Sequence, residues 1–408
     1  MHTTGVMRRL DELARFSSEP DALTRLFLSP AHKAAAQQVL AWMRESGLTA
    51  ALDAAGNVVG RIEGARPGLP AVILGSHIDT VRDAGKYDGA FGVVAAIEAV
   101  SRLRAAALPF AVEVAAFGDE EGVRFPATLI GSRALAGTLD PAALDARDAE
   151  GISVREALRR FGCDPAGLPV LARRQGDVLA YVEAHIEQGP VLEAEGLPLG
   201  VVTAIAGATR CTVEVDGMAG HAGTVPMPLR RDALCAAAGM ILAVERAARE
   251  TEGMVATVGR IEALPGAVNV IPGTARFTLD IRSADDAVRQ AGVDAITATC
   301  RRIAAERHVE LRMCHTYAEA AAPCAGPLVA ALEAAVARAG IRPRQLPSGA
   351  GHDGLAMAAL CPVGMLFVRC RGGVSHHPAE AIGEADAEIA VRVLADFLQN
   401  LDPGALAA

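Results

Sequence analysis

The sequence has 408 residues, more than one ordinary domain contains, and its composition (51% hydrophobic, 3% aromatic) predicts two globular domains with aliphatic cores. A net charge of −9 without a long run of Lys or Arg argues against nucleic acid or an anionic membrane as the main partner. The eight cysteines include no CxxC pair, which argues against a disulfide framework and a thiolate zinc site. Because we find neither a signal peptide nor an apolar stretch of about 20 residues, we expect a cytoplasmic protein that does not enter a membrane.

The first part of the chain alternates helical patterns with short apolar runs. Residues 31–47 predict a helix that ends at a glycine, residues 69–81 and 110–122 contain strands, and residues 88–105 between them predict a helix. Apolar strands alternating with helices are typical of an α/β sheet covered on both faces. Polar residues cluster where these strands end, which is where open α/β sheets place their ligand sites.

From about Thr209 the pattern changes to a compact β-α-β-β-α-β unit of about 110 residues. Three of its four strands are predicted at 209–217, 254–263 and 275–283, and its helices at 230–250 and 285–307. After it, a helix at 326–340 and a strand at 363–370 return to the first pattern. We therefore expect an α/β domain made of residues 1–208 and 323–408, with an α+β, ferredoxin-like domain inserted at 209–322.

The first polar cluster contains His77 and Asp79 in the segment GSHIDTV. Residues two apart on a strand face the same way, so the Asp79 carboxylate can lie beside the His77 imidazole. This is the arrangement in which a carboxylate fixes the tautomer of a metal-ligating histidine. A purely structural hydrogen bond would produce the same pattern.

Two acidic clusters follow. Asp88 stands at a Gly-rich turn that leads into a helix, and Asp119, Glu120 and Glu121 come directly after an apolar strand. Asp88 alone could be a helix N-cap, and the three acids alone could form a solvated turn. Like charges crowded together nevertheless cost energy unless a cation compensates them.

Histidines complete the set, with His185 in HIEQGP and His376 and His377 in SHHP. Two or three imidazoles with a few carboxylates form the mixed ligand set that suits zinc or manganese, and a shared carboxylate can bridge two such ions. Each cluster by itself has an ordinary structural explanation. Their joint placement at strand ends indicates a metal site.

Taken in order, the motifs resemble those of the hydantoinase/carbamoylase branch of the M20 metallopeptidase-like amidohydrolases. They are GSHIDTV, YDGAFGV, DEEGVRFP, HIEQGPVLE, GHAGTVPM and SHHP. The likeness covers essentially the whole chain, and HIEQGP is its most specific part, because peptidase relatives usually carry an acidic ligand there. It implies a zinc-peptidase-like catalytic domain with an inserted lid and dimerisation domain.

The resemblance also implies roles for individual residues. The implied metal ligands are His77, Asp88, Glu121, His185 and His376. Asp88 would bridge two divalent ions, with His77 and His185 at one and Glu121 and His376 at the other, and Glu120 would be the general base. The family's S-H-x-P spacing selects His376 as the ligand, with His377 as the alternative.

The resemblance places further residues at the substrate. His221, in the inserted domain, would reach the developing oxyanion from the partner subunit, which implies a homodimer. Asn269, Arg282 and Gln188 match substrate-binding positions, and His352 lies in a similar G-A-G-H-D loop. A guanidinium offers two parallel donors to a carboxylate, although Arg282 alone would be taken for a surface arginine on a strand.

We therefore expect an amidohydrolase that uses two zinc or manganese ions per subunit to cleave the ureido or N-carbamoyl C–N bond of a small carboxylate, releasing ammonia and CO2. Allantoate is placed slightly ahead of N-carbamoyl-L-amino acids. An M20 aminoacylase or dipeptidase is the nearest alternative. A non-catalytic binding protein is a further alternative, but Glu120 and all five ligand positions argue against it.

Overall fold

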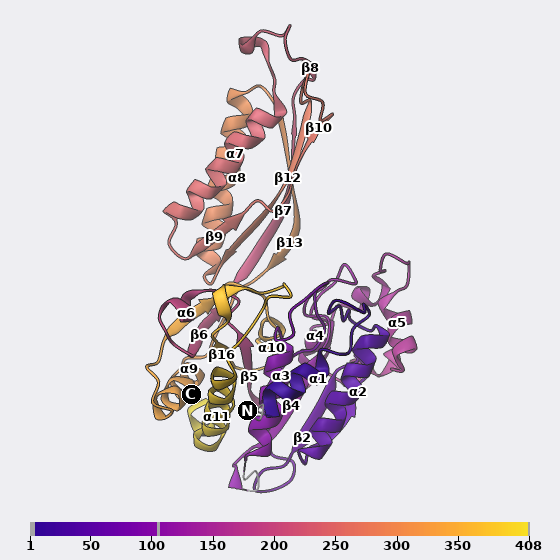
Figure 1. The fold of residues 1–408 in the computed structure, drawn as a ribbon, viewed down its shortest axis with the longest axis vertical. Coiled ribbons are helices and arrows are strands. Elements are labelled where there is room, and N and C mark those ends of the chain that lie inside the picture. The colour runs from indigo at the N-terminus through magenta and orange to yellow at the C-terminus, as the bar shows by residue number, and fades with distance from the viewer. Residues whose placement is uncertain (1–4, 104–106, 407–408) are drawn as a thin grey trace. The chain divides into compact units, whose positions relative to one another are not determined.

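The computed structural model describes residues 5–103 and 107–406, and these form two compact units. The first unit comprises Met1–Thr203 and Pro323–Ala408, and the second is Ala204–Ala322. The chain is thus a mixed α/β protein (Figure 1). No helix in the described part of the chain is long and apolar enough to cross a membrane.

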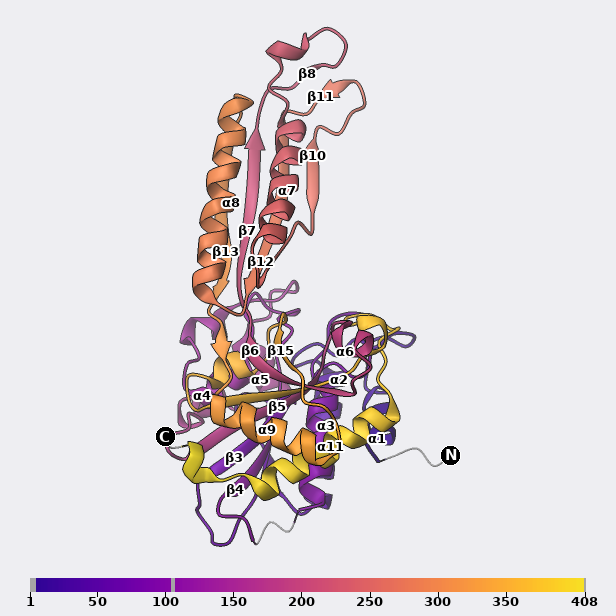
Figure 2. The ribbon, with the colours of Figure 1, turned by 90° about the vertical axis from the view of Figure 1, so that its left-hand side faces the viewer.

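Among the described residues, a nine-stranded sheet forms the centre of the first unit (Figure 2). The strands run in the order β1-β2-β4-β3-β5-β16-β6-β14, and β15 pairs with β6. Their bounds are β1 Thr49–Leu52, β2 Val58–Ile62, β3 Ala71–His77, β4 Ala111–Phe117, β5 Val178–Ile186, β6 Leu199–Ile205, β14 Ala322–Pro323, β15 Gln345–Ser348 and β16 Val363–Val368. The neighbours β4, β3, β5 and β16 are parallel, so their carboxyl ends meet at one edge of the sheet.

Helices cover the central strands of this sheet. Every residue of β3 and β4 is buried, so both faces of the sheet are covered there, as parallel sheets require. The helices are α1 Gly5–Leu13, α2 Pro30–Glu45, α3 Ala90–Ser101, α4 Ile130–Ala136, α5 Val154–Phe161, α6 Val191–Ala194, α9 Gly326–Arg338, α10 Gly354–Met357 and α11 Glu384–Asn400. Short 3-10 helices lie at Pro141–Asp145, Pro165–Val170, Arg371–Gly373 and Pro403–Leu406.

Local sequence explains where these helices begin. Ser29 caps α2 by accepting a hydrogen bond from the backbone N–H of His32, and Pro30 occupies the first helical position. The helix α3 follows Gly89 and is apolar nearly all round, because it packs on β3 and β5 and is covered in turn by α1 and α11. The helix predicted at 88–105 corresponds to α3, and its last two residues lie outside the described part of the chain.

The second unit has one five-stranded sheet with two helices packed on one face of it. The strand order is β10-β12-β7-β13, with β9 also paired to β12, and β8 forms a separate pair with β11. The bounds are β7 Gly207–Asp216, β8 Gly220–His221, α7 Ala233–Glu250, β9 Met254–Thr257, β10 Ile261–Leu264, β11 Val270–Ile271, β12 Thr274–Ser283, α8 Asp286–Glu306 and β13 Glu310–Glu319, with a 3-10 turn at Met227–Leu229. Buried and more exposed residues alternate along β7 and β12, because only one face is covered by α7 and α8.

One predicted strand of this unit is in fact two. The segment 254–263 forms β9 and β10, which pair with different halves of β12: β9 with Asp280–Ser283 and β10 with Thr274–Phe277. Between them, the Arg260 carbonyl accepts from the Thr278 N–H. Gly259 and Arg260 lie at this interruption, and an isolated glycine inside a strand pattern can mark such a break.

Candidate metal centre

The candidate ligands come from the carboxyl ends of adjacent parallel strands. His77 is the last residue of β3, His185 is the last but one of β5, and Glu121 follows β4. Asp88 lies just before α3, in the connection that follows β3. This edge of the sheet is where open α/β folds gather their functional side chains.

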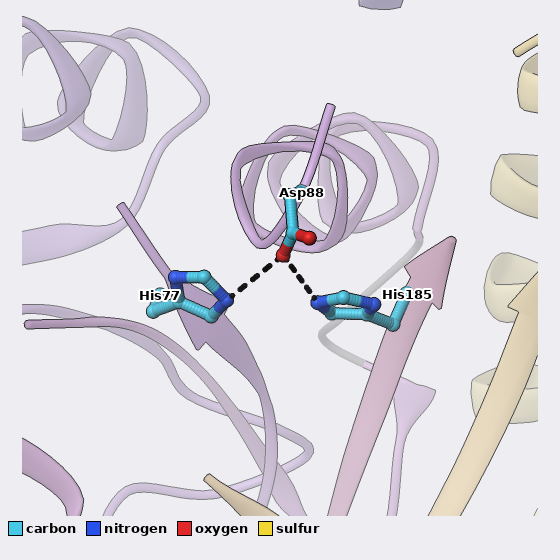
Figure 3. Close-up of side chains that lie close together, drawn as sticks. All are labelled: His77, Asp88 and His185. Atoms are coloured by element: carbon cyan, nitrogen blue, oxygen red, sulfur yellow. Dashed lines mark ion pairs between the residues drawn. The ribbon is translucent and has the colours of Figure 1, made fainter. Parts of the chain in front are cut away.

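The Asp88 carboxylate lies at the centre of the cluster and is buried (Figure 3). Its Oδ1 is 3.4 Å from His77 Nε2 and 3.2 Å from His185 Nε2, with the two imidazoles on either side of it. Gly89 makes this approach possible: its φ is +62°, and a Cβ there would lie 2.4 Å from the His77 ring. Only glycine fits this position without displacing the ring.

The second oxygen of Asp88 faces other neighbours. Its Oδ2 is 3.5 Å from His376 Nε2, which is in turn 3.4 Å from Glu121 Oε2. The same oxygen accepts hydrogen bonds from Gln188 Nε2 at 2.8 Å and Ser375 Oγ at 2.7 Å. Asp88 therefore turns one oxygen toward each of two groups of side chains, as a bridging carboxylate does.

When the two buried histidines are neutral, their hydrogen bonds select the tautomer that a metal ligand needs. His77 Nδ1 donates to the Asp79 carbonyl oxygen at 3.1 Å, and His185 Nδ1 donates to the Ile186 carbonyl oxygen at 2.9 Å. In the neutral form of each ring, Nε2 carries the lone pair and points at Asp88, and His185 Nε2 can then accept from the Gly89 N–H at 3.2 Å. Metal-binding histidines commonly anchor their other nitrogen in this way.

Asp79 connects two of the motifs. Its carboxylate lies 3.6 Å from His77 Nδ1 and accepts the backbone N–H groups of Glu120 and Glu121, each at 3.3 Å. The strand ends at His77, so Asp79 lies in the irregular segment that follows β3, outside the strand in which it was expected. A single buried carboxylate thereby sets the position of both acids that follow β4.

Electrostatics in this cluster favour a cation. Burial raises the pKa of Glu120 and of Glu121 well above the usual value, and repulsion from neighbouring carboxylates adds to it. Burial also tends to raise the pKa of Asp88, but the adjacent His185 and His77 have a larger effect and hold this pKa well below its usual value. Crowding several buried carboxylates costs energy that divalent cations would offset.

The donor atoms fit two divalent ions. Two groups, each with ligand atoms within 4.8 Å of one another, share Asp88: one with His77 and His185, the other with Glu121 and His376. His77 Nε2 and Glu121 Oε1 are buried and have no hydrogen-bond partner among the residues that the structure describes. Imidazole nitrogens and carboxylate oxygens are ligands that zinc and manganese both accept.

The two histidines of SHHP are placed differently. His376 has a φ of +55° and turns its Nε2 toward the carboxylates of Asp88 and Glu121. The side chain of His377 is exposed, and its Nδ1 accepts the Ala379 N–H. It belongs to none of the potential metal-binding groups of the described residues.

Gln188 and His352 also lie beside this cluster. Gln188 donates to Asp88, its φ is +56°, and its Oε1 is buried without a hydrogen-bond partner in the described part of the chain. His352 is fully buried, with its ring edge-on to that of His185 at 4.5 Å between centroids and its Nε2 2.7 Å from Ser348 Oγ. His352 thus packs against the candidate ligand His185.

Sequence reasoning missed Glu183. Its carboxylate is fully buried on β5, accepts hydrogen bonds from Ser76 Oγ and Tyr181 Oη, and forms a further potential metal-binding group with His185 and His352. The signal was present, because Glu183 stands two residues before His185 and shares its face of the strand.

Three of the expected substrate residues belong to the second unit. His221 is exposed on β8, and Val270 of β11 pairs with it. Asn269 directly precedes β11, and its carbonyl accepts the Ala222 N–H, so His221 and Asn269 lie together. Arg282 lies near the end of β12, where Nε and Nη2 bond both oxygens of Asp280 at 2.7 and 3.0 Å.

Comparison with known proteins finds close similarity over the whole chain. Residues 73–400 match the family described as Peptidase family M20/M25/M40. An N-carbamoyl-L-amino acid amidohydrolase of Geobacillus stearothermophilus is 44% identical, covering 97% of this chain and 98% of the relative. A probable allantoate deiminase of Oryza sativa subsp. japonica is 43% identical, covering 98% and 89%. A solved hydantoinase/carbamoylase family amidase from Burkholderia multivorans superposes with a TM-score of 0.90, at 33% identity and 97% coverage of each chain.

We expect the protein to bind two divalent ions per chain, and His376→Ala to bind fewer. Loss of His376 removes one ligand from the group that contains Glu121, so one ion should be lost or held much more weakly. Elemental analysis after dialysis against a weak chelator measures this stoichiometry. His377→Ala is the matched control and should keep both ions; loss of an ion from His377→Ala alone would exchange the roles of the two histidines.

Proposed function

Because this chain belongs to peptidase family M20/M25/M40 and is a hydrolase acting on carbon–nitrogen bonds, we propose that it hydrolyses the ureido or N-carbamoyl group of a small carboxylate, releasing ammonia and CO2. The observation that carries the proposal is the pair of donor groups sharing Asp88, with Glu120 beside them. In this proposal the first unit is catalytic, and the second is a lid and dimerisation unit.

The protein's own side chains account for proton transfer in such a reaction. Two bound divalent ions would supply the Lewis acidity that activates a water molecule and polarises the substrate carbonyl. Glu120 Oε2 lies 3.7 Å from His77 Nε2; the two groups that share Asp88 do not include Glu120, although His77, Glu120 and Glu121 form a potential metal-binding group of their own. Glu120 is therefore placed to accept the proton of the attacking water and to pass it to the leaving nitrogen.

Allantoate is the first substrate that we propose, and an N-carbamoyl-L-amino acid is the second. Both combine a ureido or carbamoyl nitrogen with a carboxylate, and relatives bearing each name match at 43% and 44% identity. An aminoacylase or dipeptidase would instead release no ammonia. A release assay over these compounds distinguishes the three.

We further propose that the enzyme acts as a homodimer. His221 and Asn269 lie beyond the end of β7 at Asp216, which pairs with Thr274, whereas Arg282 lies at the opposite end of β12. The eight residue-to-residue steps from Thr274 to Arg282 span about 27 Å of strand. One copy of this unit cannot present all three side chains to a single small substrate, so His221 and Asn269 would come from the partner subunit.

The Glu120→Gln variant should keep its ions and lose its activity. The amide has the same shape but cannot accept a proton, so kcat should fall by about 100-fold or more. Elemental analysis beside steady-state kinetics measures both quantities. Glu121→Gln is the control and should lose metal; an ion lost from Glu120→Gln would mean that the two acids have exchanged roles.

Mixing inactive variants tests action across the dimer. After subunit exchange, His221→Ala with Glu120→Gln should regain about one quarter of wild-type activity, because half of the dimers are mixed and each has one complete site. His221→Ala with Asn269→Ala should regain none, since both residues come from the same side. Equal recovery in both mixtures, or none in the first despite proven exchange, would contradict the proposal.

Replacing Arg282 tests how the carboxylate is held. Arg282→Lys should lower kcat/KM for allantoate by roughly 10- to 150-fold, because an ammonium cannot reproduce the planar pair of donors, a loss of about 1.5 to 3 kcal/mol. The carboxamide analogue of allantoate should be affected far less. Arg210→Lys is the matched control, since Arg210 also pairs with Asp280. Equal penalties on acid and amide would show that Arg282 does not bind the carboxylate.

A further inference from the structure

Glu380 is a buried carboxylate next to the metal centre that none of the roles above uses. It lies four residues after His376, and its side chain is 5% exposed. Its Oε1 accepts the backbone N–H groups of Tyr87 and Asp88, at 2.9 and 3.0 Å. One side-chain oxygen thereby fixes the backbone of the segment that carries the shared ligand.

The other oxygen of Glu380 faces the second ligand-bearing segment. Its Oε2 lies 3.2 Å from Ser375 Oγ, and Ser375 directly precedes His376. Ser375 Oγ is also 2.7 Å from Asp88 Oδ2. A hydroxyl has a single hydrogen, and the shorter contact identifies Asp88 as its main acceptor. Glu380 and Ser375 thus connect the Asp88 loop to the His376 loop, whose sequences lie nearly 300 residues apart.

The chain leaves room for this carboxylate at Gly85. A Cβ at Gly85 would lie 2.4 Å from Glu380 Cβ and 2.5 Å from its Cδ and Oε1. Real side chains do not approach so closely, so an alanine at this position would displace Glu380. Because Gly85 does not have a positive φ, its backbone itself would accept alanine.

We infer that Glu380 is a positioning residue that holds Asp88 and His376 at the spacing required for two ions. The inference rests on the dinuclear centre proposed above. Asp88 belongs to both donor groups and His376 to one, so movement of the two loops relative to each other would alter the geometry of both ion sites. Hydrogen bonds that orient the ligands of a metal typically change its affinity by about 10- to 100-fold.

Ion affinity in three variants tests this role. Zn²⁺ dissociation constants, measured by competition with a chromogenic chelator, should rise about 10- to 100-fold in Glu380→Ala. They should rise only a few-fold in Glu380→Gln, whose amide oxygen still accepts the two N–H groups while its NH₂ donates to Ser375 Oγ. Gly85→Ala should weaken binding in the same direction as Glu380→Ala, because it expels the carboxylate.

The matched control is Glu113→Gln. Glu113 is equally buried on β4, but it pairs with Arg61 and Arg173 away from the ligand loops. Its substitution should lower the unfolding temperature of the metal-free protein and leave the Zn²⁺ constants unchanged. If Glu380→Ala does not fold, the Zn²⁺ dissociation constants of Glu380→Gln and Gly85→Ala test the positioning role instead. Wild-type affinity in Gly85→Ala or in folded Glu380→Ala would overturn the positioning role alone, whereas absence of ion binding by the wild type would overturn the dinuclear centre itself.

Discussion

The Asp88 carboxylate is buried among imidazoles, and a buried charge is stable only when neighbouring groups compensate it. The first unit must therefore place such groups around Asp88. Each of its oxygens faces a different group of donors, so the side chain cannot rotate or move without disturbing both groups. The neighbouring acids Glu120 and Glu121 are held close by Asp79 although burial and mutual repulsion disfavour their charges. The negative charge concentrated in this arrangement favours the binding of divalent cations.

The fold satisfies this requirement by separating rigid support from the ligand-bearing segments. Parallel strands buried on both faces end at one edge of the sheet, and each contributes a short segment with a ligand or an acid. Few of these segments belong to helices or strands, so hydrogen bonds to side chains hold them in place. Asp79 holds the acids after β4, and Glu380 holds the loops of Asp88 and His376. Buried carboxylates therefore act here as acceptors for backbone N–H groups as well as candidate ligands.

The second unit presents a different constraint, because a sheet keeps its two ends apart. His221 and Asn269 are brought together by the pairing of β8 with β11, whereas Arg282 is held by Asp280 near the opposite end of β12. Hydrogen-bonded strands do not shorten, so this separation within the unit is fixed. The separation supports a homodimer in our proposal, in which two copies of the unit complete one site.

The sequence by itself indicated the α/β pattern, the inserted unit and the residue types of the candidate metal site, because apolar periodicity and short motifs are local properties. We predicted 254–263 as one strand, and the pairing of β9 and β10 with different halves of β12 shows that it is two. The sequence also left open which histidine of SHHP faces Asp88, and it gave no role to Glu183 or Glu380. Only the tertiary structure decided these points. His376 has a positive φ, and Glu380 accepts hydrogen bonds from the backbone of Tyr87 and Asp88, nearly 300 positions away in the sequence. Such features depend on tertiary packing, which no local sequence pattern records.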